Sequence, residues 1–163
     1  SAQNADIEVQ FDKLRDAVRA LRNVRALLEI PAAEKPDGVL HCELDSDLSF
    51  FAEQAGIITS AARIGDLEID TSDANAPTAT GTDVFSAGSV FLPMPIEADT
   101  TKLRDNLEKK LAKVIGGLNG LDKKLSNQKF IANADPEVVA NERQRQQELQ
   151  AERKTVEANL LNL

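Results

Sequence analysis

Between residues 103 and 125 a branched apolar side chain recurs every three or four positions, and this pattern constrains the fold more than any other. The repeat consists of Leu103, Leu107, Leu111, Val114, Leu118, Leu121 and Leu125. Such spacing places all seven side chains on one stripe of an α-helix and is typical of a coiled-coil seam. About 26 residues of helix extend roughly 39 Å, and a helix that long and narrow needs a partner to cover its stripe.

The following segment supplies an internal partner. Asp135 and Pro136 are typical of a helix start, as cap and first-turn residue. The opposing seam consists of Val138 or Val139, Leu149, Val156, Leu160 and Leu163, interrupted by Glu142, Gln146 and Glu152 or Arg153. Gly116, Gly117 and Gly120 together lower helix propensity by about 2.5 to 3 kcal/mol relative to Ala. We therefore expect a long antiparallel helical hairpin that is marginal and bendable. Its tip is fixed by Leu125, Phe130, Ile131 and Val138.

The first thirty residues predict an amphipathic helix that Pro31 ends. Its apolar stripe consists of Phe11, Leu14, Val18, Leu21, Val24 (or Arg25) and Leu28. On the other faces lie Lys13, Arg15, Arg19, Arg22 and Arg25. A solvated helix face is the simpler interpretation of these cations, and an anion-facing surface is the alternative.

The middle of the chain predicts a β-α-β-β order. A strand follows the turn at Pro36, a helix with a Ser/Asp cap spans residues 45–63, and "DLEID" is a short strand. Residues 82–96 predict two strands around a tight Ala-Gly turn, with Pro93 and Pro95 at a sheet edge or at the strand's exit. The expected fold class is α+β: an N-terminal helix, a small mixed sheet with one covering helix, then the helical hairpin.

Charge is distributed unevenly along the chain. Residues 1–99 hold 7 Lys and Arg against 18 Asp and Glu, a net charge of −11, whereas residues 100–163 hold 12 against 9, a net charge of +3. Because affinity for nucleic acid comes mainly from cations that neutralise phosphates, the ends of the chain are the candidate anion-facing parts. The acidic middle is expected to face away from RNA.

Several functional classes lack the residues that they need. One cysteine excludes an internal disulfide and a multi-cysteine zinc site, and neighbouring His41 and Cys42 point to opposite faces of their strand. The sequence contains no glycine-rich phosphate loop and no metal-ligand cluster. We therefore expect no catalytic residues, no metal and no cofactor. No apolar run reaches the roughly 18 to 20 residues that span a bilayer, so we expect a soluble cytoplasmic protein. A start without Met suggests a fragment.

Three stretches, in order, resemble the C-terminal region of the valyl-tRNA synthetase family of class I aminoacyl-tRNA synthetases. They are "LRNVRALLEIPAAEK", "VFLPMPIEADTTKLRDNLEKKLAKV" and "KKLSNQKFIANADPEVVANERQRQQELQAE". The third is the most specific, because its Lys-Leu-Ser-Asn, Phe, Ala-x-Pro-Glu-Val-Val and Glu-Arg groups stand at the family's spacings. The resemblance covers residues 7–163.

The resemblance implies three domains and a partner. Residues 1–31 resemble the last, truncated helix of the anticodon-binding bundle, 32–98 a small α/β linking domain, and 99–163 the coiled-coil arm that lies against the outer corner of tRNA. The parent enzyme of the family attaches valine to tRNA(Val) with ATP and Mg²⁺ and hydrolyses mischarged threonine. Its active-site motifs are absent here, so the fragment neither activates valine nor edits. The implied partners are tRNA(Val) and the remainder of the synthetase chain, with no DNA and no membrane.

A rod with one basic flank can follow the phosphates of a folded RNA without reading many bases. Lys123, Lys124, Lys129 and Arg143 lie in or beside the best-matching motif and are the first candidates. Further candidates are Lys109, Lys110, Lys113, Arg145, Arg19 and Arg22, and the wider basic set adds Lys102, Arg104, Arg153 and Lys154.

A different class of function competes with this one. An α/β platform that carries a helical hairpin is also suited to docking another protein or to dimerisation. The first helix lacks most of its expected bundle, so its apolar stripe is either exposed or buried in a dimer of the fragment.

Overall fold

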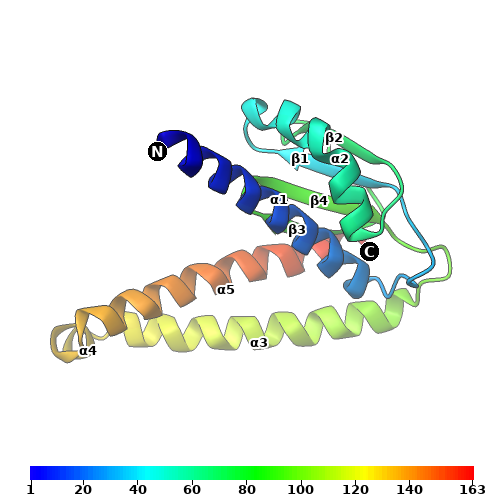
Figure 1. Ribbon diagram of the computed structural model, residues 1–163. Coiled ribbons are helices and arrows are strands. Elements are labelled where there is room, and N and C mark those ends of the chain that lie inside the picture. Colours follow the sequence, from blue (N-terminus) through cyan, green and yellow to red (C-terminus); the bar gives the residue numbers. More distant parts are fainter. The chain divides into compact units, whose positions relative to one another are not determined.

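A computed structural model describes residues 1–163, which form two compact units. The sheet unit contains residues 1–99 and the last two residues, and the arm unit contains residues 100–161. The sheet unit holds helices α1 and α2 with a four-stranded sheet, and the arm unit holds helices α3, α4 and α5 (Figure 1). The predicted α+β class is confirmed.

Helix α1 spans Ala2–Leu27 and buries one face of its second half. Leu14, Leu21, Val24 and Leu28 are buried as predicted, whereas Phe11 is 57% exposed. The helix ends before Pro31 because Glu29 adopts a left-handed conformation (φ 52°) that turns the chain. The backbone N–H of Ile30 then donates to the carbonyl of Arg25 at 3.0 Å, and the helix ends at Leu27, four residues before Pro31.

The four strands form one mixed sheet in the order β2-β1-β4-β3. Strands β1 (Gly38–Cys42) and β2 (Leu67–Thr71) are parallel, and helix α2 (Leu48–Ala62) makes the crossover that a parallel pair requires. Strand β4 (Gly88–Pro93) is antiparallel to both β1 and β3 (Thr80–Phe85). Since β4 lies inside the sheet, Pro93 marks the exit of a strand and not a sheet edge.

The β3–β4 hairpin turns one residue earlier than predicted. Phe85 pairs with Gly88, so Ser86 and Ala87 form the turn and Gly88 is the first residue of β4. A Cβ atom on Gly88 would lie 1.8 Å from the carbonyl oxygen of His41 on the neighbouring strand. The glycine is therefore required by the close approach of β4 to β1, and its φ of 159° is also one that residues with a side chain rarely adopt.

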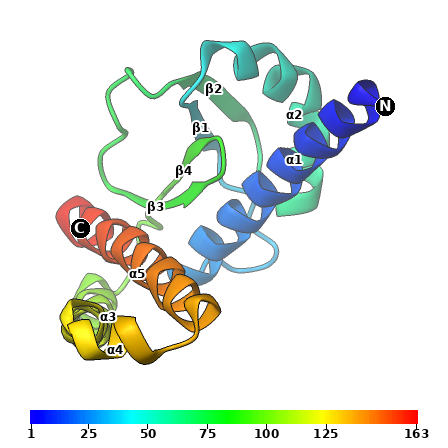
Figure 2. The ribbon, with the colours of Figure 1, turned by 90° about the vertical axis from the view of Figure 1, so that its left-hand side faces the viewer.

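Two helices cover the sheet, not one as predicted. Helix α1 packs on β3 and β4, helix α2 packs on β2, and both lie on the same side of the sheet (Figures 1 and 2). Leu21, Phe51, Leu40 and Val90 are fully buried between these layers. The prediction was wrong because it reserved the apolar face of α1 for a separate bundle.

The start of α2 differs from its predicted cap. Residues Asp45–Asp47 form a short 3-10 turn, η1, and Asp47 occupies the N-cap position without a side-chain cap bond. Its carboxylate instead accepts from the Nζ of Lys13, at 2.9 and 3.0 Å. Lys13, expected on a solvated face, is therefore half-buried in an ion pair between α1 and α2.

The arm unit is a helical hairpin with a short helix at its tip. Helix α3 spans Thr100–Ser126 without interruption, α4 spans Gln128–Asn133, and α5 spans Pro136–Asn162 (Figure 1). The side chain of Asn127 accepts from the backbone N–H of Lys129 and caps α4, which was not predicted. Asp135 accepts from the N–H of Glu137 at 3.0 Å, which confirms the predicted start of α5.

Candidate nucleic-acid interface

The leucine seam of α3 packs as its spacing predicts. Leu107, Val114, Leu118 and Leu121 are buried, and Leu103, Leu111 and Leu125 are half-buried. On α5, Val139 and Leu149 are half-buried and Val156 is buried, whereas Val138 is 42% exposed. The choice between Val138 and Val139 is therefore decided for Val139.

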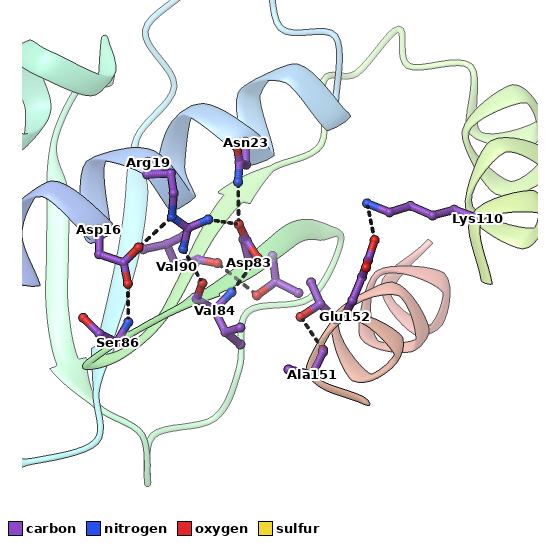
Figure 3. Close-up of polar contacts among 12 residues, drawn as sticks. Asp16, Arg19, Asn23, Asp83, Val84, Ser86, Val90, Lys110, Ala151 and Glu152 are labelled. Atoms are coloured by element: carbon purple, nitrogen blue, oxygen red, sulfur yellow. Dashed lines mark hydrogen bonds and ion pairs between the residues drawn. The ribbon is translucent and has the colours of Figure 1, made fainter. Parts of the chain in front are cut away.

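The polar residues that interrupt the α5 seam contact α3. Glu142 pairs with Lys124 at 2.7 Å, Gln146 donates to Asp122, and Glu152 lies 3.5 Å from Lys110 (Figure 3). Each step toward the end of α3 is matched by a step toward the start of α5, as an antiparallel register requires. These side chains fix the register at positions where apolar packing is weak.

Some of the predicted RNA-binding cations are engaged within the arm. Lys110 and Lys124 form the two interhelical ion pairs, and Arg153 pairs with Glu157 at 2.8 Å along α5. The Nζ of Lys124 also lies 5.0 Å from the centre of the Phe130 ring, a cation–π distance. Lys124 therefore links α3, α4 and α5. Its expected contact with RNA remains a prediction.

Other cations of the arm are exposed and form no ion pair in the structure. They are Arg104, Lys109, Lys113, Lys123, Lys129, Arg143, Arg145 and Lys154. Helix α3 carries 7 basic against 3 acidic side chains, and α5 carries 4 against 5. The positive net charge of the arm is therefore concentrated on α3. The summed charge of residues 100–163 does not reveal this difference between the two long helices.

The tip of the hairpin is less enclosed than predicted. Phe130 is half-buried beneath Lys124, but Ile131 is 38% and Val138 42% exposed. The prediction that Ile131 and Val138 fix the tip by packing is wrong, because Ile131 on α4 and Val138 on α5 are both exposed. The cap on α4 and the Lys124–Phe130 contact hold the tip instead.

In the sheet unit, Arg19 joins helix α1 to the β3–β4 hairpin (Figure 3). Its guanidinium donates to Asp16 at 2.6 Å, to Asp83 at 3.3 Å and to the carbonyl of Val84 at 3.1 Å. Asp16 in turn accepts from the backbone N–H of Ser86 at 2.6 Å. Burial alone would raise the pKa of Asp16, but the bonds from Arg19 and Ser86 and the charge of Arg19 outweigh it, so this pKa lies below its usual value. Burial likewise opposes the raised pKa of Arg19, which Asp16 and Asp83 produce.

Two further arginines of α1 are engaged inside the sheet unit. Arg22 donates twice to the carbonyl of Ala61, at 3.1 and 2.8 Å, which ties α1 to the end of α2. Arg25, expected on a solvated face, is only 8% exposed and donates to three backbone carbonyls. The pattern held a signal for this burial, because position 25 also lies on the apolar stripe. RNA contact by Arg19 and Arg22 remains a prediction.

The structure also contains no membrane-spanning helix and no metal site. No helix combines the length and the apolar character that crossing a membrane requires. The His, Cys, Asp and Glu side chains form no group of three or more that could hold a metal ion.

The chain is similar to known proteins along most of its length. Residues 99–163 match the family model described as "Valyl tRNA synthetase tRNA binding arm". The valine--tRNA ligase of Agrobacterium fabrum is 35% identical over 140 residues, which are 86% of this chain and 14% of that protein. The valine--tRNA ligase of Streptococcus agalactiae serotype Ia is 37% identical over 156 residues, or 91% of this chain and 17% of that protein.

The chain therefore spans only about a sixth of the length of these relatives. The arm match begins at residue 99, and the arm unit begins at residue 100, so sequence similarity and compactness mark the same segment. The chain belongs to the valyl-tRNA synthetase family, and its helical hairpin is the segment that matches that family's arm.

Proposed function

We propose that this chain is a non-catalytic part of a valine--tRNA ligase and contributes binding of tRNA(Val) through its arm. The observation that carries the proposal is the match of residues 99–163 to the tRNA-binding arm, over the segment that forms its own helical unit. The arm meets the outer corner of the tRNA, where a rod can follow the phosphate backbone by shape and charge.

The remainder of the longer protein carries the chemistry. In this proposal it binds ATP and Mg²⁺, activates valine, transfers it to tRNA(Val) and hydrolyses mischarged threonine in the cytoplasm. The present chain needs no cofactor and holds the arm through the sheet unit. The small share of each relative that the chain covers supports this division.

A filter-binding titration tests the proposal with the 163-residue chain and two RNAs. One is a tRNA(Val) transcript, and the other is the same transcript with substitutions in the D- and T-loops that open the outer corner. We expect tighter binding of the intact transcript and a loss of affinity as salt is raised. Absence of binding to the intact transcript at low salt contradicts the proposal, and equal binding of both RNAs contradicts the corner contact.

The competing function, a protein-docking or dimerisation module, has one observation in its favour. Ile7, Val9 and Phe11 on the first half of α1 are each more than half exposed, at 59%, 54% and 57%. Sedimentation of the chain over a concentration series, with and without Phe11→Ser, separates the two functions. The docking module is favoured if the chain forms a dimer that Phe11→Ser dissociates and if the chain does not bind RNA.

A further inference from the structure

We propose that the arm faces the phosphate backbone of its tRNA with the outer side of α3, through Lys109, Lys113 and Lys123, and not with α5. This inference rests on the proposed tRNA binding and names the side of the arm that performs it. We call these three residues the outer lysine face.

The three lysines lie on the side of α3 that points away from α5. At 3.6 residues per turn they fall within an arc of roughly 80°, and the centre of that arc is about 150° from the centre of the buried seam. All three are exposed. Helix α5 covers the buried seam and reaches the flank at Gly117, between the seam and the lysines, where a Cβ atom would lie 3.2 Å from the Cδ1 of Leu149.

The charges of this face are available to an external anion. None of the three ammonium groups forms an ion pair in the structure, unlike Lys110 and Lys124, which are bound to carboxylates of α5. From Lys109 to Lys123 the face extends about 21 Å along the helix axis, at 1.5 Å per residue. Three unpaired cations over that length are suited to several successive phosphates and are less suited to a single small anion.

No bulky side chain blocks the path between the lysines. Gly116 and Gly120 lie on the same side, between Lys113 and Lys123, and a Cβ atom at either position would have no neighbour within 4 Å. A polynucleotide backbone can therefore approach the helix closely there. The one carboxylate on this side is Asp105, a turn before Lys109, and no ion pair joins the two.

The α5 side of the arm offers a weaker field. At 3.6 residues per turn, Arg143 and Lys154 share one flank of α5, Arg145 lies on the other flank, and Glu137 and Glu148 lie on the outer side. With 4 basic against 5 acidic side chains, α5 has a net charge of −1, whereas α3, with 7 against 3, has a net charge of +4. The negatively charged backbone of RNA therefore complements α3 better than α5.

Two matched variants of the 163-residue chain test this inference. One neutralises the outer lysine face with Lys109→Gln, Lys113→Gln and Lys123→Gln. The other removes the same amount of charge from α5 with Arg143→Gln, Arg145→Gln and Lys154→Gln. Gln has nearly the helix propensity of Lys and Arg, so both variants keep the fold, which circular dichroism checks. The probe is a tRNA(Val) transcript titrated by filter binding at several salt concentrations.

We expect the α3 variant to lose at least about tenfold in affinity near 100 mM salt and the slope of log affinity against log salt to shrink by about 2 to 3. The α5 variant is expected to lose less than about threefold. An equal or larger loss in the α5 variant overturns the inference while leaving tRNA binding intact. If the unmodified chain does not bind at all, the proposed function fails as well.

A single substitution that is expected to raise the affinity, and not to lower it, strengthens the test. Asp105→Asn removes the repelling carboxylate from the outer lysine face and is expected to tighten binding by roughly two- to threefold. Glu148→Gln removes one negative charge from the outer side of α5 and serves as the control. Equal tightening by both substitutions, or none by Asp105→Asn, contradicts a phosphate backbone on α3.

Discussion

Arg25 ties helix α1 to the loop that follows it and to the end of α2 through backbone carbonyls. Its Nη1 donates to the carbonyls of Glu34 and Arg63, at 2.9 and 2.6 Å, and its Nη2 donates to that of Pro31 at 2.9 Å. Arg25→Ala leaves these acceptors without their partner and is expected to lower the free energy of unfolding by about 2 to 4 kcal/mol. Urea denaturation of the chain measures the loss. Arg22→Ala, on an exposed side chain, is expected to cost about 1 kcal/mol or less, and similar costs for the two would contradict this role.

Asp16 makes the stability of the sheet unit depend on pH in the acidic range. Its pKa is held below the usual Asp value of about 3.9 by its bonds to Arg19 and Ser86 and by the charge of Arg19, despite its burial. A depressed carboxyl pKa adds stability above the unfolded value, and this stability is lost as the pH falls from about 4 toward the folded pKa. Asp16→Asn should therefore be less stable than the parent at pH 7, with a gap that shrinks as the pH falls below about 4. Denaturation at several pH values tests this, and a gap that does not depend on pH would contradict it.

At the same scale, the sequence predicted which residue types form the site but not which cations remain unpaired. Lys123 and Lys124 are neighbours with the same chemistry, and the sequence alone makes both of them equal candidates for RNA contact. Lys124 pairs with Glu142, which is 18 residues away in the chain, and this contact exists only in the observed register of the hairpin. The burial of Arg25 depended likewise on the carbonyls of Pro31 and Glu34, in the loop after α1, and on that of Arg63, 38 residues away.

At the scale of elements, the glycines of α3 fall into two kinds. A Cβ atom on Gly116 or Gly120 meets nothing within 4 Å, whereas one on Gly117 meets Leu149 at 3.2 Å. Gly116→Ala is therefore expected to raise the stability of the arm by about 1 kcal/mol, the usual difference between these residues in a helix. Gly117→Ala gains less because Leu149 must shift. Thermal unfolding of single variants ranks them, and an equal gain for Gly117→Ala would show that the helices are not in close contact there.

Helices with a regular repeat of apolar residues or a clear cap were predictable from the sequence. A short helix without such a repeat, and a turn whose glycine is required by another strand, were not. The seven-residue seam predicted α3, and the Asp135-Pro136 pair predicted the start of α5, because both signals lie within one helix. Helix α4 was missed because it has only 6 residues and no apolar period, and its one signal was the cap residue Asn127. The turn at Ser86–Ala87 was displaced because the need for Gly88 arises on a neighbouring strand.

At the scale of the whole molecule, the chain consists of a sheet unit and an arm unit. The α+β class and the β-α-β-β succession of elements followed from patterning along the chain, whereas the order of the strands within the sheet was not predicted. Helix α1 was assigned to a separate bundle because the family resemblance implied one, whereas its apolar face covers the sheet within residues 1–99. The structure leaves only the first half of α1, with Ile7 and Phe11, without cover. A boundary at residue 31 inside a longer chain remains a prediction.

In the proposed complex, the outer lysine face of α3 lies against RNA. Lysine acetylation followed by mass spectrometry measures this directly in the unmodified chain, with and without a saturating tRNA(Val) transcript. Lys109, Lys113 and Lys123 should be protected several-fold by the RNA, while Lys154 on α5 and Lys35 in the sheet unit should react at unchanged rates. Protection of Lys154 with unchanged reactivity of the three α3 lysines would contradict the claim.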